Sequence, residues 1–205
     1  LPEDTLRQVV AFLRGFETAD GRHVLGAQAW RMLLSGPIGC GKSSVAQALA
    51  HRFGKALFTV HLDRIVGEPD ARSLLELVRD NARFHDAVLH LVRPDRMSES
   101  DSRLIGPLSR LFEDYPSLSI LEAHHAERLD PSFESLIHFA IAVDRPDAEV
   151  REKLWAAMLP RDIAFAPGMS LGPLSVSYEL TGAQIRAAVD WAVQRSMVTE
   201  PHQIE

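Results

Sequence analysis

The chain has 205 residues, enough to bury a core in one or two domains, and its 46% hydrophobic and 24% charged residues are typical of a globular protein. No apolar run approaches the roughly 18 residues that would span a bilayer, and the net charge of −6 disfavours a broad nucleic-acid interface. The single cysteine, Cys40, has no partner for an internal disulfide, which fits a cytoplasmic protein.

The chain begins at Leu1 without a signal-like segment, so we expect a fragment of a longer protein. Apolar residues at helical spacing from Leu6 to Phe16 predict a first helix that ends near Gly15, followed by a loop over residues 21–28. Further along the chain, apolar segments predict five strands, over residues 30–35, 56–63, 87–92, 118–123 and 138–143.

Helices are predicted between these strands, over residues 44–53, 71–84 and 101–115. The helix over residues 71–84 is expected to bury an apolar face of Leu74, Leu77, Val78 and Ala82. The alternation indicates an α/β fold with a five-stranded parallel sheet and helices on both faces.

Beyond Asp144 the pattern predicts helices alone, over residues 147–158 and 182–197, separated by a stretch rich in Pro and Gly. This change predicts a small C-terminal helical lid domain. The expected division of the chain is a helix and linker over 1–24, a large α/β domain over 25–145 and the lid over 146–205.

A phosphate-binding loop joins the first strand to the next helix. It has the complete G-x-x-x-x-G-K-[ST] pattern, Gly36-Pro37-Ile38-Gly39-Cys40-Gly41-Lys42-Ser43. Its backbone N–H groups, with Ser44 at the start of the helix, are expected to surround the phosphates of ATP or ADP. Lys42 would reach the outer phosphates, Ser43 would ligate Mg²⁺, and Cys40 is expected to pack as a small apolar residue. The sequence therefore predicts a P-loop NTPase domain.

Three further stretches, in the same order as the family's own motifs, resemble the AAA+ ATPases. They are Leu129–Phe133, similar to "L-D-P-A-F", Asp144–Arg151, similar to "P-D-x-x-x-R", and Leu180–Arg186, similar to "L-S/T-G-x-x-I-R". The resemblance is to the AAA branch, which includes bacterial ATPases with tandem AAA domains. It implies a ring of AAA+ domains, in the same chain or in a homo-oligomer, with Arg186 as a sensor that contacts the γ-phosphate.

The groups that would hydrolyse ATP differ from those of the family. Its third strand ends in Asp-Glu, which orient Mg²⁺ and activate water, whereas Val92 and Arg93 stand here. Ser135 and Leu136 replace the arginine finger, and His124 replaces an Asn that polarises the water. His90, inside the third strand, is expected to be a core residue. Neither Val nor Arg can do the work of a carboxylate, so no catalytic residue is assigned.

The leading hypothesis is a nucleotide-binding AAA+ module whose hydrolysis is lost or very weak and which acts structurally or regulates a neighbouring domain. The segment over residues 63–69 also lacks the aromatic residue of a substrate-gripping pore loop. With Ser43 as its one expected protein ligand, Mg²⁺ should add little to nucleotide affinity. Two alternatives stay open: an active ATPase that uses Asp95 or Glu99 for Mg²⁺ and Arg128 as a displaced finger, and a nucleotide-free scaffold.

Overall fold

The computed structural model describes residues 1–18, 25, 29–96, 102–160, 164–165, 170–198 and 203–204. These residues belong to two compact units. The first unit comprises Leu1–Glu3, Pro37–Gly41 and Asp144–Glu205, and the second comprises Asp4–Gly36 and Lys42–Val143. The predicted division at 24/25 and 145/146 stays a prediction. Apart from Leu25, the loop predicted over residues 21–28 lies outside the described residues.

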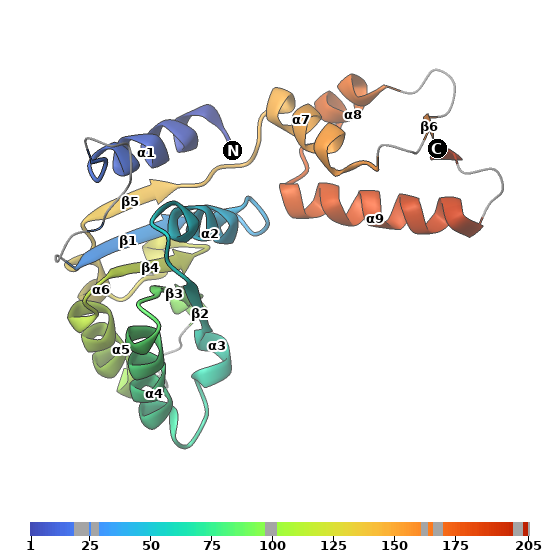
Figure 1. Cartoon of the computed structure of the whole chain (residues 1–205). Coiled ribbons are helices and arrows are strands. Elements are labelled where there is room, and N and C mark those ends of the chain that lie inside the picture. The colour runs from blue at the N-terminus through green and yellow to red at the C-terminus, as the bar shows by residue number, and fades with distance from the viewer. Residues whose placement is uncertain are drawn as a thin grey trace. The chain divides into compact units, whose positions relative to one another are not determined.

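The second unit is built on a five-stranded sheet in the order β2-β3-β4-β1-β5, with every neighbouring pair parallel (Figure 1). The strands are β1 (Trp30–Ser35), β2 (Leu57–His61), β3 (Val88–Val92), β4 (Leu118–Ala123) and β5 (Phe139–Ala142). Because the strands are parallel, their carboxyl ends meet at one edge of the sheet. The predicted five-stranded parallel sheet is therefore confirmed, with strand ends shifted by at most two residues.

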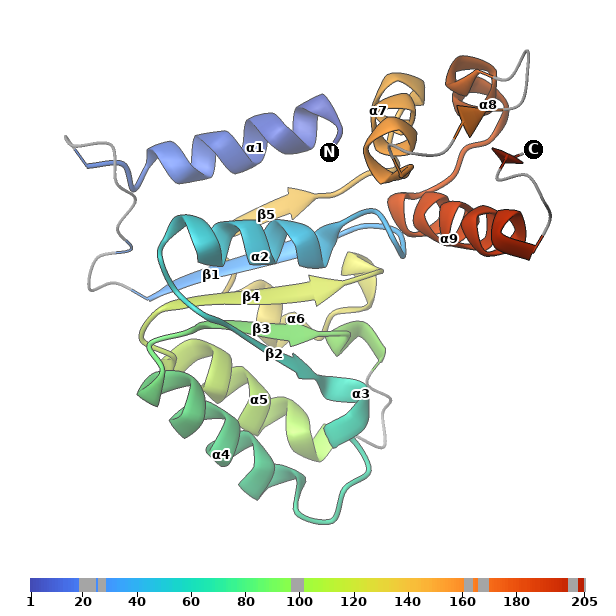
Figure 2. The same ribbon diagram turned by 45° about the vertical axis from the view of Figure 1, so that its right-hand side comes forward.

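Helices cover both faces of this sheet. They are α1 (Glu3–Arg14), α2 (Lys42–Arg52), α3 (Leu62–Ile65), α4 (Ala71–Phe84), α5 (Ser102–Asp114) and α6 (Pro131–Glu134), with short 3₁₀ turns at Pro94–Arg96 and Ala126–Arg128. Helices α1 and α2 lie over one face, and α4 and α5 lie over the other (Figure 2). Leu89 and Leu91 of β3 pack into the core under α4 and α5, so the alternate residues Val88, His90 and Val92 point to the α2 side.

The apolar face predicted for α4 is wrong in part. Leu75 and Ala82 are buried, with Val78 packed against the same core, whereas Leu77 is 59% exposed. The buried stripe therefore keeps Val78 and Ala82 of the predicted face but contains Ala71 and Leu75 in place of Leu74 and Leu77. Leu74, Leu77 and Phe84, which is 84% exposed, form a second apolar stripe on the solvent side.

An aromatic cluster fixes α1 to the sheet at β1 and β5. Phe12 of α1 lies 4.9 Å from Phe139 of β5 and 6.3 Å from Phe53, measured between ring centroids. Trp30, the first residue of β1, lies 5.6 Å from Phe139. Tilted and edge-to-face contacts of this kind add to the stabilisation that comes from burying the rings.

The first unit contains the helices α7 (Ala148–Met158), α8 (Leu171–Ser177) and α9 (Gly182–Val198), and a pair of two-residue strands, β6 (Ala164–Phe165) and β7 (Gln203–Ile204). Trp155, Ile185 and Val189 form its small core. Arg151 is buried and donates hydrogen bonds to the carbonyl groups of Ser175 and Pro146, which ties α7 to α8. Within the described ranges, no helix is both long enough and apolar enough to cross a bilayer.

The contribution of one buried hydrogen bond to stability can be tested at Tyr115. Its hydroxyl donates a 2.7 Å hydrogen bond to the Ala87 carbonyl inside the core. Burial, together with the charge of Asp86, raises the pKa of the Tyr115 hydroxyl to about 12. Tyr115→Phe should lower the free energy of unfolding by about 1–2 kcal/mol, because the carbonyl loses its donor. Urea unfolding followed by circular dichroism measures this loss. The exposed Tyr178→Phe is the matched control, and an equal loss in both variants would contradict the prediction.

Candidate functional site

The loop between β1 and α2 has a backbone that only glycine adopts readily at several positions. Gly36, Gly39 and Gly41 have φ angles of 138°, 80° and 100°. At Gly36 there is also no room for a side chain, because an added Cβ would lie 2.2 Å from the carbonyl oxygen of Val143. The glycines thus let the chain turn sharply between β1 and α2.

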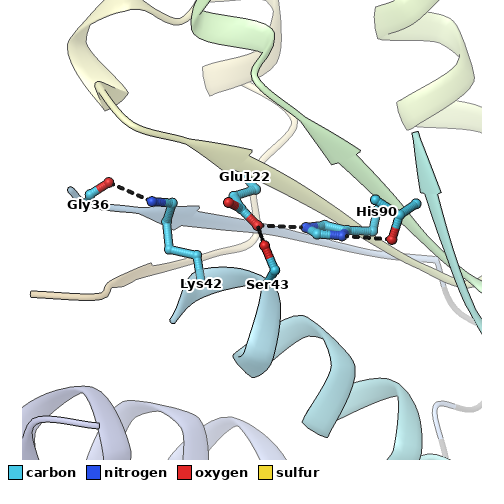
Figure 3. A network of polar contacts seen from close by, with 6 residues as sticks. Gly36, Lys42, Ser43, His90 and Glu122 are labelled. Carbon is cyan, nitrogen blue, oxygen red and sulfur yellow. Dashed lines mark hydrogen bonds and ion pairs between the residues drawn. The ribbon is translucent and has the colours of Figure 1, made fainter. Parts of the chain in front are cut away.

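Lys42 and Ser43 form the start of α2. Lys42 is only 2% exposed, and its ammonium group donates a 2.7 Å hydrogen bond to the Gly36 carbonyl (Figure 3). The lysine therefore bends back toward the start of the loop, the place where it would meet outer phosphates. Ser43 and Ser44 are both exposed residues of α2, and the Ser43 hydroxyl points toward Glu122 of the sheet.

The remaining loop residues, Pro37–Gly41, belong to the first unit. Within that unit the Gly39 carbonyl accepts a 3.1 Å hydrogen bond from the Ala183 N–H at the start of α9. Ile38 is exposed and Cys40 is buried, which fits a packing role for the cysteine. Arg186 lies on α9 with an exposed side chain, and its proposed contact with the γ-phosphate stays a prediction.

A buried carboxylate lies beside Ser43. Glu122 of β4 is 6% exposed, and its Oε2 accepts a 2.7 Å hydrogen bond from the Ser43 hydroxyl (Figure 3). The same oxygen lies 3.1 Å from Nε2 of His90, and Nδ1 of His90 lies 3.2 Å from the Thr59 hydroxyl. An ionised carboxylate only accepts hydrogen bonds, so Nε2 carries the proton, and in the neutral ring Nδ1 accepts from Thr59. Thr59, His90, Glu122 and Ser43 thus form a continuous polar row.

The row keeps Glu122 ionised. Burial, the largest influence, acts to raise the pKa of its carboxyl, but the hydrogen bonds from His90 and Ser43 and the positive charge of Lys42 lower the pKa below its ordinary value. Burial also lowers the pKa of the neighbouring His124 imidazole, and the charge of Lys42 lowers it further. The site therefore holds a negative carboxylate close to a positive lysine and a histidine that favours its neutral form.

Glu122 is not among the residues that the sequence predicted for this site, where Ser43 was the one expected protein ligand of Mg²⁺. Asp95, one of the two acids considered for Mg²⁺, is 7% exposed, and its Oδ2 accepts the backbone N–H groups of His124 and His125 at 3.2 Å each. It therefore holds the turn after β4, and the other acid, Glu99, lies outside the described residues. One sequence signal could have identified Glu122: it is the only charged residue in the otherwise apolar strand over residues 118–123.

The structure also places the four residues that stand where the resemblance expects hydrolytic groups. Val92 is buried, and Arg93, with a φ of 67°, forms a 2.8 Å ion pair with Asp63. After α6, Ser135 bonds the local backbone and Leu136 packs against the core. Neither finger position therefore presents a cation.

The first glycine of the loop can be tested through stability. Gly36→Ala should lower the free energy of unfolding by at least about 3 kcal/mol, since a Cβ there combines a strained φ with an overlap on Val143. Gly54→Ala is the matched control, because Gly54 also has a positive φ, of 66°, but nothing within 4 Å of its added Cβ. It should cost about 1 kcal/mol. Urea unfolding compares the two, and equal losses would contradict the close approach.

Comparisons with known proteins agree with this architecture. The chain is 29% identical over 196 residues to an ATP-dependent zinc metalloprotease FtsH from Paraburkholderia phymatum, an alignment that covers 84% of the chain and 30% of FtsH. A solved katanin structure, from work on katanin self-assembly, superposes with a TM-score of 0.73 at 17% identity. That match covers 93% of this chain and 65% of the katanin chain. The chain therefore spans less than two thirds of either protein.

The family assignment rests on a longer match than any single motif. The sequence model of the ATPase family associated with various cellular activities (AAA) matches residues 32–145, more than half of the chain, from within β1 to just beyond β5. The fold is likewise that of a P-loop NTPase, as predicted. The chain belongs to the AAA ATPase family and is an AAA+ nucleotide-binding module.

Proposed function

We propose that this module holds ATP or ADP on residues 36–44 while hydrolysing it very weakly or not at all, and that it acts structurally or regulates other AAA+ domains. One observation carries the proposal. A complete phosphate-binding loop stands beside positions 92 and 93, where valine and arginine replace the two acids that would serve hydrolysis.

Three features of the second unit support phosphate binding. The N-terminus of α2 directs backbone N–H groups and a positive dipole end toward the loop. Lys42 adds a cation whose bond to the Gly36 carbonyl a phosphate oxygen can replace. Ser43 adds a hydroxyl that is already oriented by Glu122. All three groups can bind the phosphates or their metal ion, and none of them can activate the water that hydrolysis requires.

Weak hydrolysis is supported by the chemistry at the strand ends. The guanidinium group of Arg93 cannot accept a proton from water, and its ion pair with Asp63 holds it at the end of β3. Asp95, the acid that the alternative of an active ATPase would use, accepts two backbone N–H groups through Oδ2, whereas its Oδ1 is buried with no hydrogen bond from the described residues. An arginine finger, which contributes roughly 10³ to 10⁵ in rate, has no counterpart at Ser135 or Leu136.

A surface stripe on α4 supports association with other AAA+ domains. Leu74, Leu77 and Phe84 are exposed on one side of this helix, and exposed apolar patches favour protein contacts. The structural neighbour katanin is described as self-assembling. By analogy, we propose that this chain associates with other AAA+ domains in a ring or a tandem array. A nucleotide-free scaffold remains the competing proposal.

Nucleotide binding is tested at Lys42. Lys42→Ala should abolish retention of labelled ATP in equilibrium dialysis, because the loop loses its one cation for the outer phosphates. Lys153→Ala, an exposed lysine on α7, is the matched control and should bind as the unaltered chain does. Circular dichroism verifies that both variants fold. No retention by the unaltered chain would leave only the scaffold.

Hydrolysis is tested by turnover. The unaltered chain should release phosphate from ATP no faster than Lys42→Ala, and Asp95→Asn and Glu99→Gln should leave that background unchanged. Turnover well above the Lys42→Ala background would refute the assignment. A fall of such turnover in Asp95→Asn or Glu99→Gln would favour the active ATPase with displaced acids.

A further inference from the structure

We infer that Glu122 is the carboxylate that, with Ser43, holds the Mg²⁺ of the bound nucleotide, so that the metal-side acid of this module stands on β4 and not on β3. The inference rests on the proposed nucleotide binding and specifies how that site treats the divalent cation. Among P-loop NTPases, the cation is held by the loop Ser or Thr and an acid at the end of a neighbouring strand.

The register of the sheet brings the two strand positions to the same level. Val92, which stands where that acid is expected, is the direct partner of Glu122 across the β3–β4 pair. Both residues lie on the α2 side of the sheet, because partners in a parallel pair share a face. Moving the acid from β3 to β4 shifts its backbone sideways by about 4.8 Å, one strand spacing. Glu has one methylene more than Asp, which offsets part of that shift.

The donor set fits a magnesium ion. Mg²⁺ prefers hard oxygen ligands in an octahedral shell at about 2.0–2.1 Å, in which neighbouring oxygens lie about 2.9 Å apart. Ser43 Oγ and Glu122 Oε2 are a hydroxyl and a carboxylate oxygen separated by 2.7 Å. Within the part of the chain that the structure describes, no hydrogen bond reaches Glu122 Oε1, so the carboxylate keeps acceptor capacity. When bound, the ion would neutralise phosphate charge and link the nucleotide to these two side chains.

His90 and Thr59 position the carboxylate. His90 Nε2 donates to Oε2 from β3, and Thr59 of β2 fixes the histidine ring through Nδ1. Partners behind a metal ligand commonly orient it in this way. The row explains why a histidine is buried inside β3, opposite Thr59 in the sheet register. We therefore treat His90 as a positioning residue for Glu122.

A purely structural reading makes a different prediction. In that reading Glu122 serves only to balance the charge of Lys42 and to bond Ser43, so its replacement would weaken nucleotide binding with and without Mg²⁺ alike. A metal ligand behaves otherwise. Without Mg²⁺ its negative charge repels the phosphates, and with Mg²⁺ it strengthens binding.

The experiment compares Glu122→Gln with the unaltered chain by equilibrium dialysis of labelled ATP, once with Mg²⁺ and once with EDTA. In the unaltered chain, Mg²⁺ should tighten ATP binding, because the ion would link the phosphates to Ser43 and Glu122. In Glu122→Gln this gain should disappear, while affinity in EDTA stays equal or improves. Glu127→Gln removes an exposed carboxylate after β4 and should keep the full Mg²⁺ gain.

A second variant distinguishes the loss of a metal ligand from structural damage caused by Glu122→Gln. Adding Val92→Asp to Glu122→Gln returns an acid to the partner position on β3, and the Mg²⁺ gain should return with it. Circular dichroism establishes folding for each variant. A Mg²⁺ gain that persists in Glu122→Gln, or a folded double variant that does not regain it, overturns the inference. Nucleotide retention without any Mg²⁺ effect in the unaltered chain overturns the inference alone, whereas no retention in either buffer overturns the proposed function as well.

Discussion

Burial of one negative charge governs the arrangement at the end of the sheet. Removing a carboxylate from water costs several kcal/mol unless donors replace the lost water, and Glu122 is almost fully buried. The donors come from two different elements, Ser43 from α2 and His90 from β3, and Thr59 on β2 supports the histidine. The hydrogen bonds that stabilise the Glu122 carboxylate therefore connect the first turn of α2 to the adjacent strands β4, β3 and β2. Both ends of the phosphate-binding loop are therefore held in place, one by the pairing of β1 in the sheet and the other by the bond of Ser43 to Glu122.

The residues proposed to bind nucleotide and the positions compared with hydrolytic groups of the family lie in different parts of the chain. The loop from Gly36 to Ser43 and the start of α2 form a continuous segment, whereas the groups for hydrolysis would come from the ends of β3 and β4 and from α6. Replacing an acid by Val92 or Arg93 leaves the loop backbone untouched. The ion pair of Arg93 with Asp63 even gives the altered position a structural role.

The sequence predicted the strands and the loop because both depend on local patterns. Continuous apolar segments specify buried parallel strands, and the glycine spacing specifies the loop. The sequence did not predict the short helices α3, α6 and α8, nor two features of the second unit that depend on its packing. The side of α4 that faces the sheet was predicted in part only, because Leu74 and Leu75 are adjacent apolar residues and the sequence does not show which of them is buried. The contact of Ser43 with Glu122 depends on which strands are neighbours in the sheet and on their register. The search for a metal-side acid compared only the end of the third strand with the family motif, so it did not reach Glu122 on the fourth strand.

The polar row has a consequence for how the sheet assembles. Side chains alternate between faces, so a shift of β3 by one residue would turn His90 away and leave Leu89 or Leu91 next to the charge of Glu122. Such a misaligned sheet would leave the buried carboxylate with Ser43 as its one remaining side-chain donor, although β3 would still be apolar on both faces. Parallel strands pair over long sequence separations and form slowly, which gives incorrect pairings time to compete. We expect the polar row to destabilise misaligned registers of β3 relative to the native one, because burial of apolar side chains alone distinguishes these registers poorly.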